Sequence, residues 1–251
     1  MTTLATRSHP LRRIGHKGAD HIAPGNTIAS FEAALEQRVD MIEFDVLPER
    51  PDGTGRLLLA HDYRDANRRR ATILELEDGL AHFATDAYAG VELDVDLKLG
   101  GYEDRVCVAL REHGLAARAL VSTMVRESLP RVRAAAPEVR LGWSVPHVRR
   151  DYLAHPLTRP LALAGLQVAR QAIPRRAGRE LRAGRIDAVM AHWALVTGGF
   201  ARRIAAAGGE LYVWTVDDAA RIAALEALPG VTGVITNDPR LFAAQAADII
   251  S

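Results

Sequence analysis

Cysteine is almost missing from this chain, which has Cys107 alone among its 251 residues. A single cysteine excludes an internal disulfide and any metal site built from several cysteines. Cys107 lies in the apolar run VCVAL, which favours a buried structural thiol over a catalytic nucleophile. We therefore expect a reduced protein whose chemistry does not depend on thiols.

Long apolar runs and an excess of charge of one sign are lacking too. No apolar run approaches the roughly 18 residues of a membrane span. The opening segment MTTLATRSHPLRR is polar and basic, unlike a secretory signal. The 32 Lys and Arg are balanced by 31 Asp and Glu, so nucleic acid is not the expected partner. We expect a cytoplasmic protein without stable membrane insertion, and its oligomeric state stays open.

Short apolar segments alternate with helical patterns from one end of the chain to the other. The predicted strands are 12–16, 41–47, 91–98, 119–124, 140–145, 186–192, 210–216 and 233–237, with a further extended segment at 56–62. The predicted helices are 27–38, 102–114, 127–137, 199–209 and 218–228. Thr27 is the expected N-cap of the first helix, and Asp217 or Asp218 that of the last.

Eight strands that alternate with helices predict a parallel sheet. No linker rich in Gly or Ser divides the chain, so we predict one α/β domain over residues 1–251, folded as a TIM (β/α)8 barrel. An open doubly wound sheet is the alternative, although no GxGxxG follows the first strand. The segment 146–185 is the least regular, and we interpret its basic run at 175–185 as a solvated helix face.

Two predicted strands have one charged face, because side chains alternate along a strand with a period of two. In MIEFDVL the charged residues are Glu43 and Asp45. In VELDVDLK they are Glu92, Asp94, Asp96 and Lys98. In a barrel the apolar face packs on the helices, so the charged face is expected to point toward the barrel axis.

Three of these acids, Glu43, Asp45 and Asp96, stand toward the carboxyl ends of their strands, where barrel active sites form. Together they make an oxygen-rich site for Mg²⁺ or Ca²⁺. Internal ion pairing, such as Asp96 with Lys98, and an edge strand with one wet face are the alternatives. Clustered Cys or His for a zinc site are lacking.

Two histidines end extended segments near these acids: His16 and His61. A histidine at a strand end is commonly a hydrogen-bonded structural residue. Two that bracket an acidic strand are also suited to paired proton transfer, one as base and one as acid.

Lysine is the rarest basic residue, with Lys17 and Lys98 as its two examples among 32 basic positions. Lys17 follows His16, and Lys98 follows Asp96 by two residues. Chance explains such a placement, or the two cations face an anionic substrate, with phosphate as the leading candidate.

The ordered set HKG, APGNT, FEAAL, MIEFDV and LLLAHD resembles the glycerophosphodiester phosphodiesterase family. That family's usual pattern is His-Arg-Gly, Pro-Glu-Asn-Thr, a Glu-x-Asp strand and His-Asp. Further along, DVDLK resembles its Glu-x-Lys strand, and YVWTVDD and GVITNDP resemble its closing segments. The resemblance spans residues 12–242.

The resemblance implies a TIM barrel that hydrolyses glycerophosphodiesters to glycerol 3-phosphate and an alcohol with one divalent cation, Mg²⁺ or Ca²⁺ and also Mn²⁺. Its site residues carry over as follows: His16 and His61 as acid and base, Glu43, Asp45 and Asp96 as metal ligands, Lys17 and Lys98 on the phosphate, and Trp214 beside the glycerol moiety. Without the resemblance, Trp214 reads as a core residue.

The chain departs from the family pattern at several positions. Lys17 replaces an arginine, Gly25 a glutamate, Asp96 a glutamate and Asn237 an aspartate, and the Arg-Thr-Thr-x-Gly segment after His61 is missing. Two other functions stay open: a sphingomyelinase D-like lyase that forms a cyclic phosphate, and a barrel that binds phosphodiesters without turnover.

Overall fold

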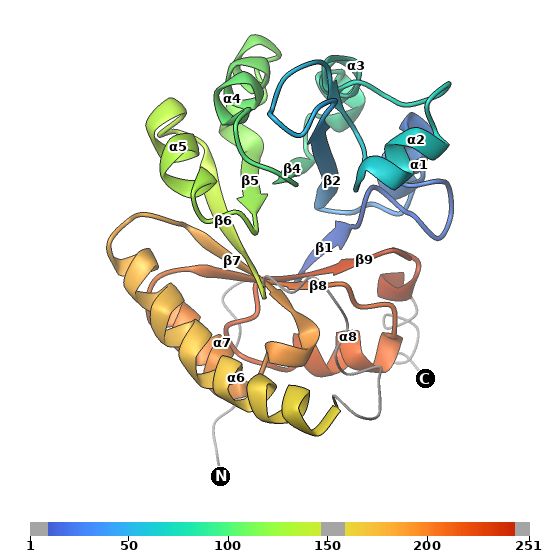
Figure 1. The fold of residues 1–251 in the computed structure, drawn as a ribbon. Coiled ribbons are helices and arrows are strands. Elements are labelled where there is room, and N and C mark those ends of the chain that lie inside the picture. Colours follow the sequence, from blue (N-terminus) through green and yellow to red (C-terminus); the bar gives the residue numbers. More distant parts are fainter. Residues whose placement is uncertain (1–9, 147–158, 244–251) are drawn as a thin grey trace.

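The fold is a closed barrel of eight parallel strands with helices around the outside (Figure 1), seen in a computed structural model that describes residues 10–146 and 159–243. The strands are β1 Arg12–Gly15, β2 Met41–Pro48, β4 Glu92–Leu97, β5 Ala119–Thr123, β6 Arg140–Val145, β7 Ala188–His192, β8 Glu210–Trp214 and β9 Gly233–Thr236. β1 pairs with both β2 and β9, which closes the sheet. The TIM-barrel prediction is confirmed, and the open sheet is excluded.

The five predicted helices are present, and each is a little shorter than expected. They are α1 Ile28–Glu36, α4 Glu103–Glu112, α5 Ser128–Ala135, α7 Gly198–Ala205 and α8 Ala219–Glu226. Thr27 caps α1, and Asp218 rather than Asp217 caps α8. Asp217 instead accepts hydrogen bonds from the backbone N–H and the side-chain Nδ2 of Asn237, which follows β9.

Three further helices were not predicted: α2 Tyr63–Arg68, α3 Leu76–Phe83 and α6 Arg159–Arg182. α2 and α3 are short, and α6 continues through Pro174. Within the basic run, Arg175, Arg176 and Arg179 are exposed while Ala177 is buried, so the solvated helix face is confirmed there. Short 3-10 turns lie at Asp86–Tyr88, Ala116–Arg118 and Trp193–Leu195. Residues 147–158 of the irregular segment and residues 1–9 of the polar start lie outside the described residues.

The extended segment 56–62 forms only the two-residue strand β3, Leu57–Leu58. It runs antiparallel against the end of β2, with Leu58 opposite Leu47. His61 therefore stands beyond β3, just before α2, and is not the last residue of a strand.

The alternation of side chains along β2 and β4 divides the buried residues into an outer group against the helices and an inner group inside the barrel. Phe44 points outward and stacks on Phe83 of α3 with ring centroids 5.2 Å apart. The interior of the barrel holds a separate apolar cluster that includes Met41, Met190 and Tyr212. The acids of the same strands share this interior, as the alternation predicted.

The amino ends of the strands are closed by an ion-pair network. Glu92 Oε2 lies 2.5 Å from Arg12 Nη1 and 2.5 Å from Arg140 Nη2, and Arg140 also pairs with Glu210 at 3.1 Å. Interior charge is therefore neutralised at this end, which in barrels of this kind serves stability rather than catalysis. Among the described helices, none is both long and apolar enough to cross a membrane.

Candidate active site

Three carboxylates meet toward the carboxyl ends of β2 and β4. One oxygen of each of Glu43, Asp45 and Asp96 lies within 4.8 Å of the others. The parallel register sets Asp45 beside Asp96, and the strand period turns Glu43 to the same face as Asp45. Glu43 and Asp45 are buried and Asp96 is half-buried. The convergence predicted from the sequence is present.

The ammonium of Lys98 lies between two of these carboxylates. Its Nζ is 2.5 Å from Asp45 Oδ1 and 2.5 Å from Asp96 Oδ2. Burial alone would lower the pKa of Lys98, but Asp45 and Asp96 raise it well above its ordinary value. Burial works against ionisation of Asp45 too, yet Lys98 lowers the pKa of that carboxyl below its usual range. The pairing of Asp96 with Lys98 thus coexists with the carboxylate cluster.

One ammonium does not neutralise three carboxylates. Burial and the neighbouring Asp45 raise the pKa of Glu43 well above its ordinary value, because a further negative charge here is costly. A divalent cation would relieve that repulsion, and carboxylate oxygens are the ligands that Mg²⁺ and Ca²⁺ prefer. The donor set and its uncompensated charge fit such an ion.

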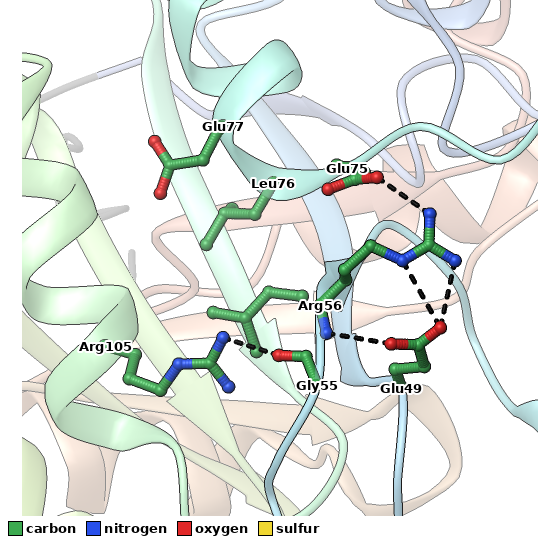
Figure 2. A pocket seen from close by; sticks show the side chains of 8 residues that line it. Glu49, Gly55, Arg56, Glu75, Leu76, Glu77 and Arg105 are labelled. Atoms are coloured by element: carbon green, nitrogen blue, oxygen red, sulfur yellow. Dashed lines mark hydrogen bonds and ion pairs between the residues drawn. The ribbon is translucent and has the colours of Figure 1, made fainter.

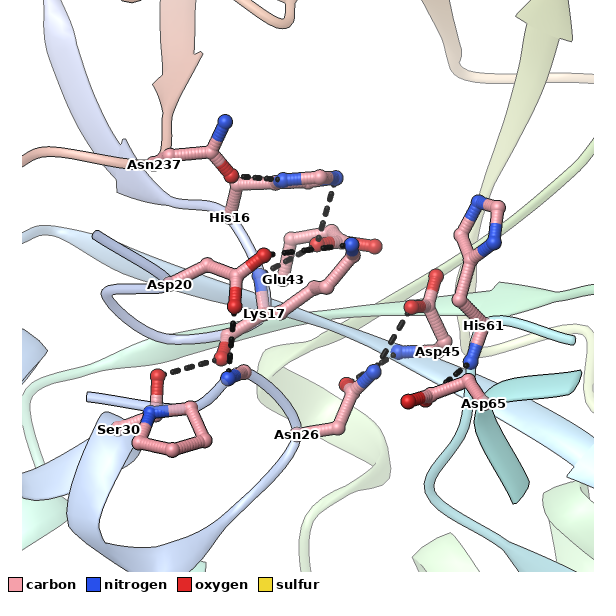
Figure 3. A network of polar contacts seen from close by, with 12 residues as sticks. His16, Lys17, Asp20, Asn26, Ser30, Glu43, Asp45, His61, Asp65 and Asn237 are labelled. Carbon is pink, nitrogen blue, oxygen red and sulfur yellow. Dashed lines mark hydrogen bonds and ion pairs between the residues drawn. The ribbon is translucent and has the colours of Figure 1, made fainter. Parts of the chain in front are cut away.

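Asn26 orients Asp45 from the loop between β1 and α1 (Figure 3). Asn26 Nδ2 donates to Asp45 Oδ2 at 2.8 Å, and the backbone N–H of Asp45 donates to Asn26 Oδ1 at 3.0 Å. Asn26 has a φ of 58°, a left-handed conformation that asparagine tolerates better than most residues. This role was not predicted from the sequence, where the available signal was the Asn of APGNT, the motif that ends at the N-cap Thr27.

The same loop ties Lys17 to the cluster through its backbone. The N–H of Lys17, at a φ of 51°, donates to Glu43 Oε2 at 2.8 Å. The Lys17 ammonium lies 3.4 Å from Asp20 Oδ2, at the edge of the site. Lys17 thus lies close to the acids, but its charge is held by a residue that the sequence analysis did not single out.

His16 is held by a chain of two hydrogen bonds from the end of β9. His16 Nδ1 lies 2.5 Å from Asn237 Oδ1, and Asn237 Nδ2 donates to Asp217 Oδ2 at 2.7 Å. Because Asp217 accepts from the amide nitrogen, the amide oxygen faces the ring and Nδ1 is the protonated nitrogen. Burial, reinforced by the Lys17 ammonium, lowers the pKa of His16 to about 4. His16 is therefore neutral, with the lone pair on Nε2, which lies 3.8 Å from Glu43 Oε2.

His61 stands on the other side of the acids in the view of Figure 3. Its side chain is 53% exposed, and its Nδ1 lies 3.6 Å from Asp62 Oδ2. Its backbone N–H donates to Asp65 Oδ2 at 3.4 Å, which ties the residue to the first turn of α2. The two histidines therefore differ: His16 is half-buried and His61 is open to water.

A cavity of about 150 Å³ connects these groups, and both histidines, Glu43, Asp96, Lys98 and Trp214 line it. Trp214 Nε1 donates to the carbonyl of Met190 at 2.9 Å, which fixes the indole at the end of β8. Trp214 is thus both packed on the interior cluster and part of the cavity wall. Lys17 is not part of this lining.

Asp94 lies deeper in the same cavity, and the sequence analysis gave it no role. It is fully enclosed, and its Oδ1 has no hydrogen-bond partner among the described residues. Burial and the neighbouring Asp96 raise the pKa of Asp94 to about 8.

A family model of the glycerophosphoryl diester phosphodiesterases matches residues 16–48 and 84–241. The chain belongs to this family. Membership makes it a phosphoric diester hydrolase, as the resemblance implied. No curated protein matches the chain.

Solved structures of glycerophosphodiester phosphodiesterases share the fold. The one from Parabacteroides distasonis is 15% identical with a TM-score of 0.72, over 96% of this chain and 98% of its own. The one from Agrobacterium tumefaciens is 20% identical with a TM-score of 0.67, over 93% and 99%. An Oleispira antarctica phosphodiesterase, solved with the product sn-glycerol-3-phosphate, is 19% identical with a TM-score of 0.68, over 95% and 97%.

The family match omits residues 49–83, and this gap contains His61. It coincides with the segment where the chain lacks the family's Arg-Thr-Thr-x-Gly pattern. The position of His61 near the carboxylate cluster is therefore supported by the geometry of β3 and α2 and not by the family match. In contrast, His16, Glu43, Asp45 and Asp96 all lie inside the matched ranges.

A larger cavity of about 350 Å³ lies outside the barrel, beside β3, α3 and α4 (Figure 2). Arg56 lies 2.9 Å from Glu49 Oε1 and 2.8 Å from Glu75 Oε1, and Arg105 donates to the carbonyl of Gly55 at 2.7 Å. Each of its charged groups already has a partner, since Glu77 pairs with His113, and none of the clustered acids lines it. The smaller cavity is therefore the candidate active site of this family member.

Proposed function

We propose that the chain hydrolyses glycerophosphodiesters to glycerol 3-phosphate and an alcohol, with one divalent cation held by Glu43, Asp45 and Asp96. One observation carries this proposal: two histidines of different environment line one cavity together with a carboxylate cluster, in a member of this family. The Oleispira antarctica structure supports the product class.

The proposed domain covers residues 1–251. The proposed partner is a small-molecule phosphodiester and not a nucleic acid, and the proposed location is the cytoplasm.

Mg²⁺ and Ca²⁺ are the proposed ions, with Mn²⁺ as a further candidate, since all three accept oxygen ligands. When bound, such an ion polarises phosphoryl oxygens and lowers the pKa of a nucleophile. Asn26 supports this role because it binds Asp45 Oδ2 and keeps Oδ1, which contacts Lys98, turned toward the cluster.

His16 is the proposed general base. Its Nδ1 proton is committed to Asn237, so the free Nε2 is available to take a proton from the attacking water. His61 is the proposed general acid for the leaving alcohol, and its exposed position suits a group that departs toward solvent. Lys98 and Lys17 offset charge that develops on the phosphoryl oxygens, and Trp214 packs against the glycerol moiety.

The test is a panel of glycerophosphodiesters assayed with Mg²⁺, Ca²⁺, Mn²⁺ and EDTA, with products followed by phosphorus NMR. We expect glycerol 3-phosphate, cation-dependent turnover, and losses of about 10²–10⁴-fold in kcat for His16→Ala and His61→Ala. His113→Ala is the matched control, because His113 pairs with Glu77 on the outer surface. Near wild-type turnover by both histidine variants, with cation bound, would refute the assignment.

The same assay separates the two other functions. A cyclic phosphate product would mean that a hydroxyl of the substrate attacks, as in a lyase. Cation-independent binding of diesters by titration calorimetry, with no turnover across the panel, would mean a binding barrel, in which Lys98 pairs with Asp45 and Asp96 without a metal ion.

A further inference from the structure

Asp20 lies in the loop between β1 and α1 and touches both unusual residues of that loop (Figure 3). Asp20 Oδ2 is 3.4 Å from Lys17 Nζ, and Asp20 Oδ1 accepts the backbone N–H of Gly25 at 2.8 Å. Lys17 stands where an arginine is expected and Gly25 where a glutamate is expected. One carboxylate therefore links the two departures from the family pattern.

Gly25 is needed here for space and not for backbone conformation. Its φ lies outside the left-handed region, so other residues can adopt it. However, a Cβ at this position would lie 2.6 Å from Asp20 Oδ1 and 2.8 Å from Lys17 Cβ. A side chain at residue 25 thus collides with the present pair, and the carboxylate comes from residue 20 instead.

The loop around this pair is fixed on the barrel. Ser30 Oγ donates to the carbonyl of Lys17 at 2.8 Å and accepts the N–H of Ala19 at 2.7 Å, and the N–H of His21 donates to the carbonyl of Asn237 at 3.0 Å. The backbone of residues 17–21 therefore has little freedom, while the long Lys17 stem has several rotatable bonds. The position of the Lys17 ammonium therefore depends on the contacts of its side chain.

We propose that Asp20 is a positioning residue that holds the Lys17 ammonium at the phosphate subsite, in place of a carboxylate at residue 25. The Lys17 and Asp20 side chains are only partly buried, at 19% and 33% exposed, and lie next to His16, which lines the cavity, so a bound phosphate can extend to the pair. An ammonium has three donors, so one weak contact to Asp20 leaves the others for phosphoryl oxygens. The backbone N–H of Lys17 donates to Glu43 Oε2 at 2.8 Å, which places the residue beside the reacting groups. This inference rests on the proposed phosphate-binding role of Lys17.

The test is a double-mutant cycle with Asp20→Asn and Lys17→Gln, read by titration calorimetry with inorganic phosphate and glycerol 3-phosphate. Asp20→Asn keeps an oxygen for the Gly25 N–H and removes only the charge. We expect this change to weaken binding about tenfold when Lys17 is present and less than about twofold in Lys17→Gln. For the diester we expect KM to rise by a similar factor with kcat nearly unchanged. Asp104→Asn, an exposed acid of α4, is the control.

A loss that is equal in both backgrounds, or no loss, would overturn the proposal, because a merely structural role of Asp20 does not depend on Lys17. Gly25→Ala gives a second measurement: we expect its Tm loss to be smaller in Asp20→Gly than in the wild type, and an equal loss would contradict the shared space. If phosphate binding shows the coupling but no diester is hydrolysed, the proposed function fails and the role of Asp20 stands. If diesters are hydrolysed and the coupling is absent, only this inference fails.

Discussion

Asn237 Oδ1 lies 2.5 Å from His16 Nδ1, although the two residues are 221 positions apart in the chain. Asp217 fixes the orientation of Asn237 by accepting two hydrogen bonds, one from Asn237 Nδ2 and one from the Asn237 backbone N–H. The amide therefore presents its oxygen to the ring, and the His16 tautomer follows from that orientation. A neutral amide serves here in place of the aspartate that the family pattern leads one to expect.

Asn237→Asp should move the acid limb of the pH profile. A carboxylate beside Nδ1 favours the protonated ring, so the pKa of His16 should rise from about 4 by at least about one unit. A base must be unprotonated to act, so kcat/KM should fall more at pH 5 than at pH 8. Asp217→Asn in the same chain removes the new repulsion and should retain the shift. An unchanged acid limb in both variants would argue against His16 as the base.

Lys98→Gln should separate cation binding from phosphate binding. The Lys98 ammonium neutralises Asp45 and Asp96, so its loss leaves the acids repelling one another. We expect Tm to fall in EDTA and to recover when a divalent cation is added, with cation affinity kept or increased. Affinity for glycerol 3-phosphate should fall about tenfold or more. If calorimetry shows that cation affinity collapses, Lys98 supports the ion site in some other way.

Asn26→Ala should weaken both the fold and the cation site. It removes two hydrogen bonds to Asp45 and places alanine at a φ of 58°. We expect a loss of about 2–4 kcal/mol in the free energy of unfolding and of about 10–100-fold in cation affinity. Denaturant unfolding and calorimetry measure these. Asn26→Asp keeps the acceptor for the Asp45 N–H but places a second carboxylate against the Asp45 carboxylate. We therefore expect its main effect to be a lower free energy of unfolding in EDTA, with a smaller loss of cation affinity.

Asp94→Asn should stabilise the protein, and more so at higher pH. The native state holds the Asp94 proton up to a pKa of about 8, whereas the unfolded chain releases it near 3.8. The native state therefore binds more protons across this window, and the Asp94 contribution to stability falls as pH rises through it. Unfolding in urea with EDTA at pH 5, 6, 7 and 8 should show a gain over wild type that grows with pH, by at most about 1.4 kcal/mol per unit. A gain that is constant or shrinks with pH would contradict this.

Glu92→Gln should affect stability without affecting catalysis. Glu92 holds Arg12 and Arg140 at the amino ends of the strands, at the opposite end of the barrel from the clustered acids. Removing its charge leaves two arginines close together, so we expect a loss of about 1–3 kcal/mol in the free energy of unfolding with kcat unchanged. Glu49→Gln, which weakens the exposed pair with Arg56, should cost under about 1 kcal/mol. A fall in kcat for Glu92→Gln would mean that the two ends of the barrel are coupled.

The sequence anticipated the strands well because their signal is local. Apolar and charged residues alternate in 41–47 and 91–98, and this period alone fixed which side chains turn toward the axis. The same alternation identified Glu43, Asp45 and Asp96 as neighbours. α2 carries little apolar pattern in YRDANR, and α6 contains Pro174, so neither offered a signal that local reasoning could use.

The partners of the site residues were decided by the tertiary structure. Asn26, Asn237 and Asp217 reach His16 and Asp45 only because β1 pairs with β9 and β2 in the closed barrel. Nothing in the spacing of His16 and His61 showed that one is half-buried and the other exposed, since burial depends on which loops cover each strand end.

By itself, then, the sequence determined the barrel, the acidic strands and the family, because residue type and period act within one segment. The tertiary structure decided that Lys98 lies between Asp45 and Asp96, and that Asp20 takes the space beside Gly25. These relations depend on distances between side chains of separate strands and within a folded loop. Closure of the sheet and the path of the chain after β1 set those distances, and neither is encoded in a repeat of residues.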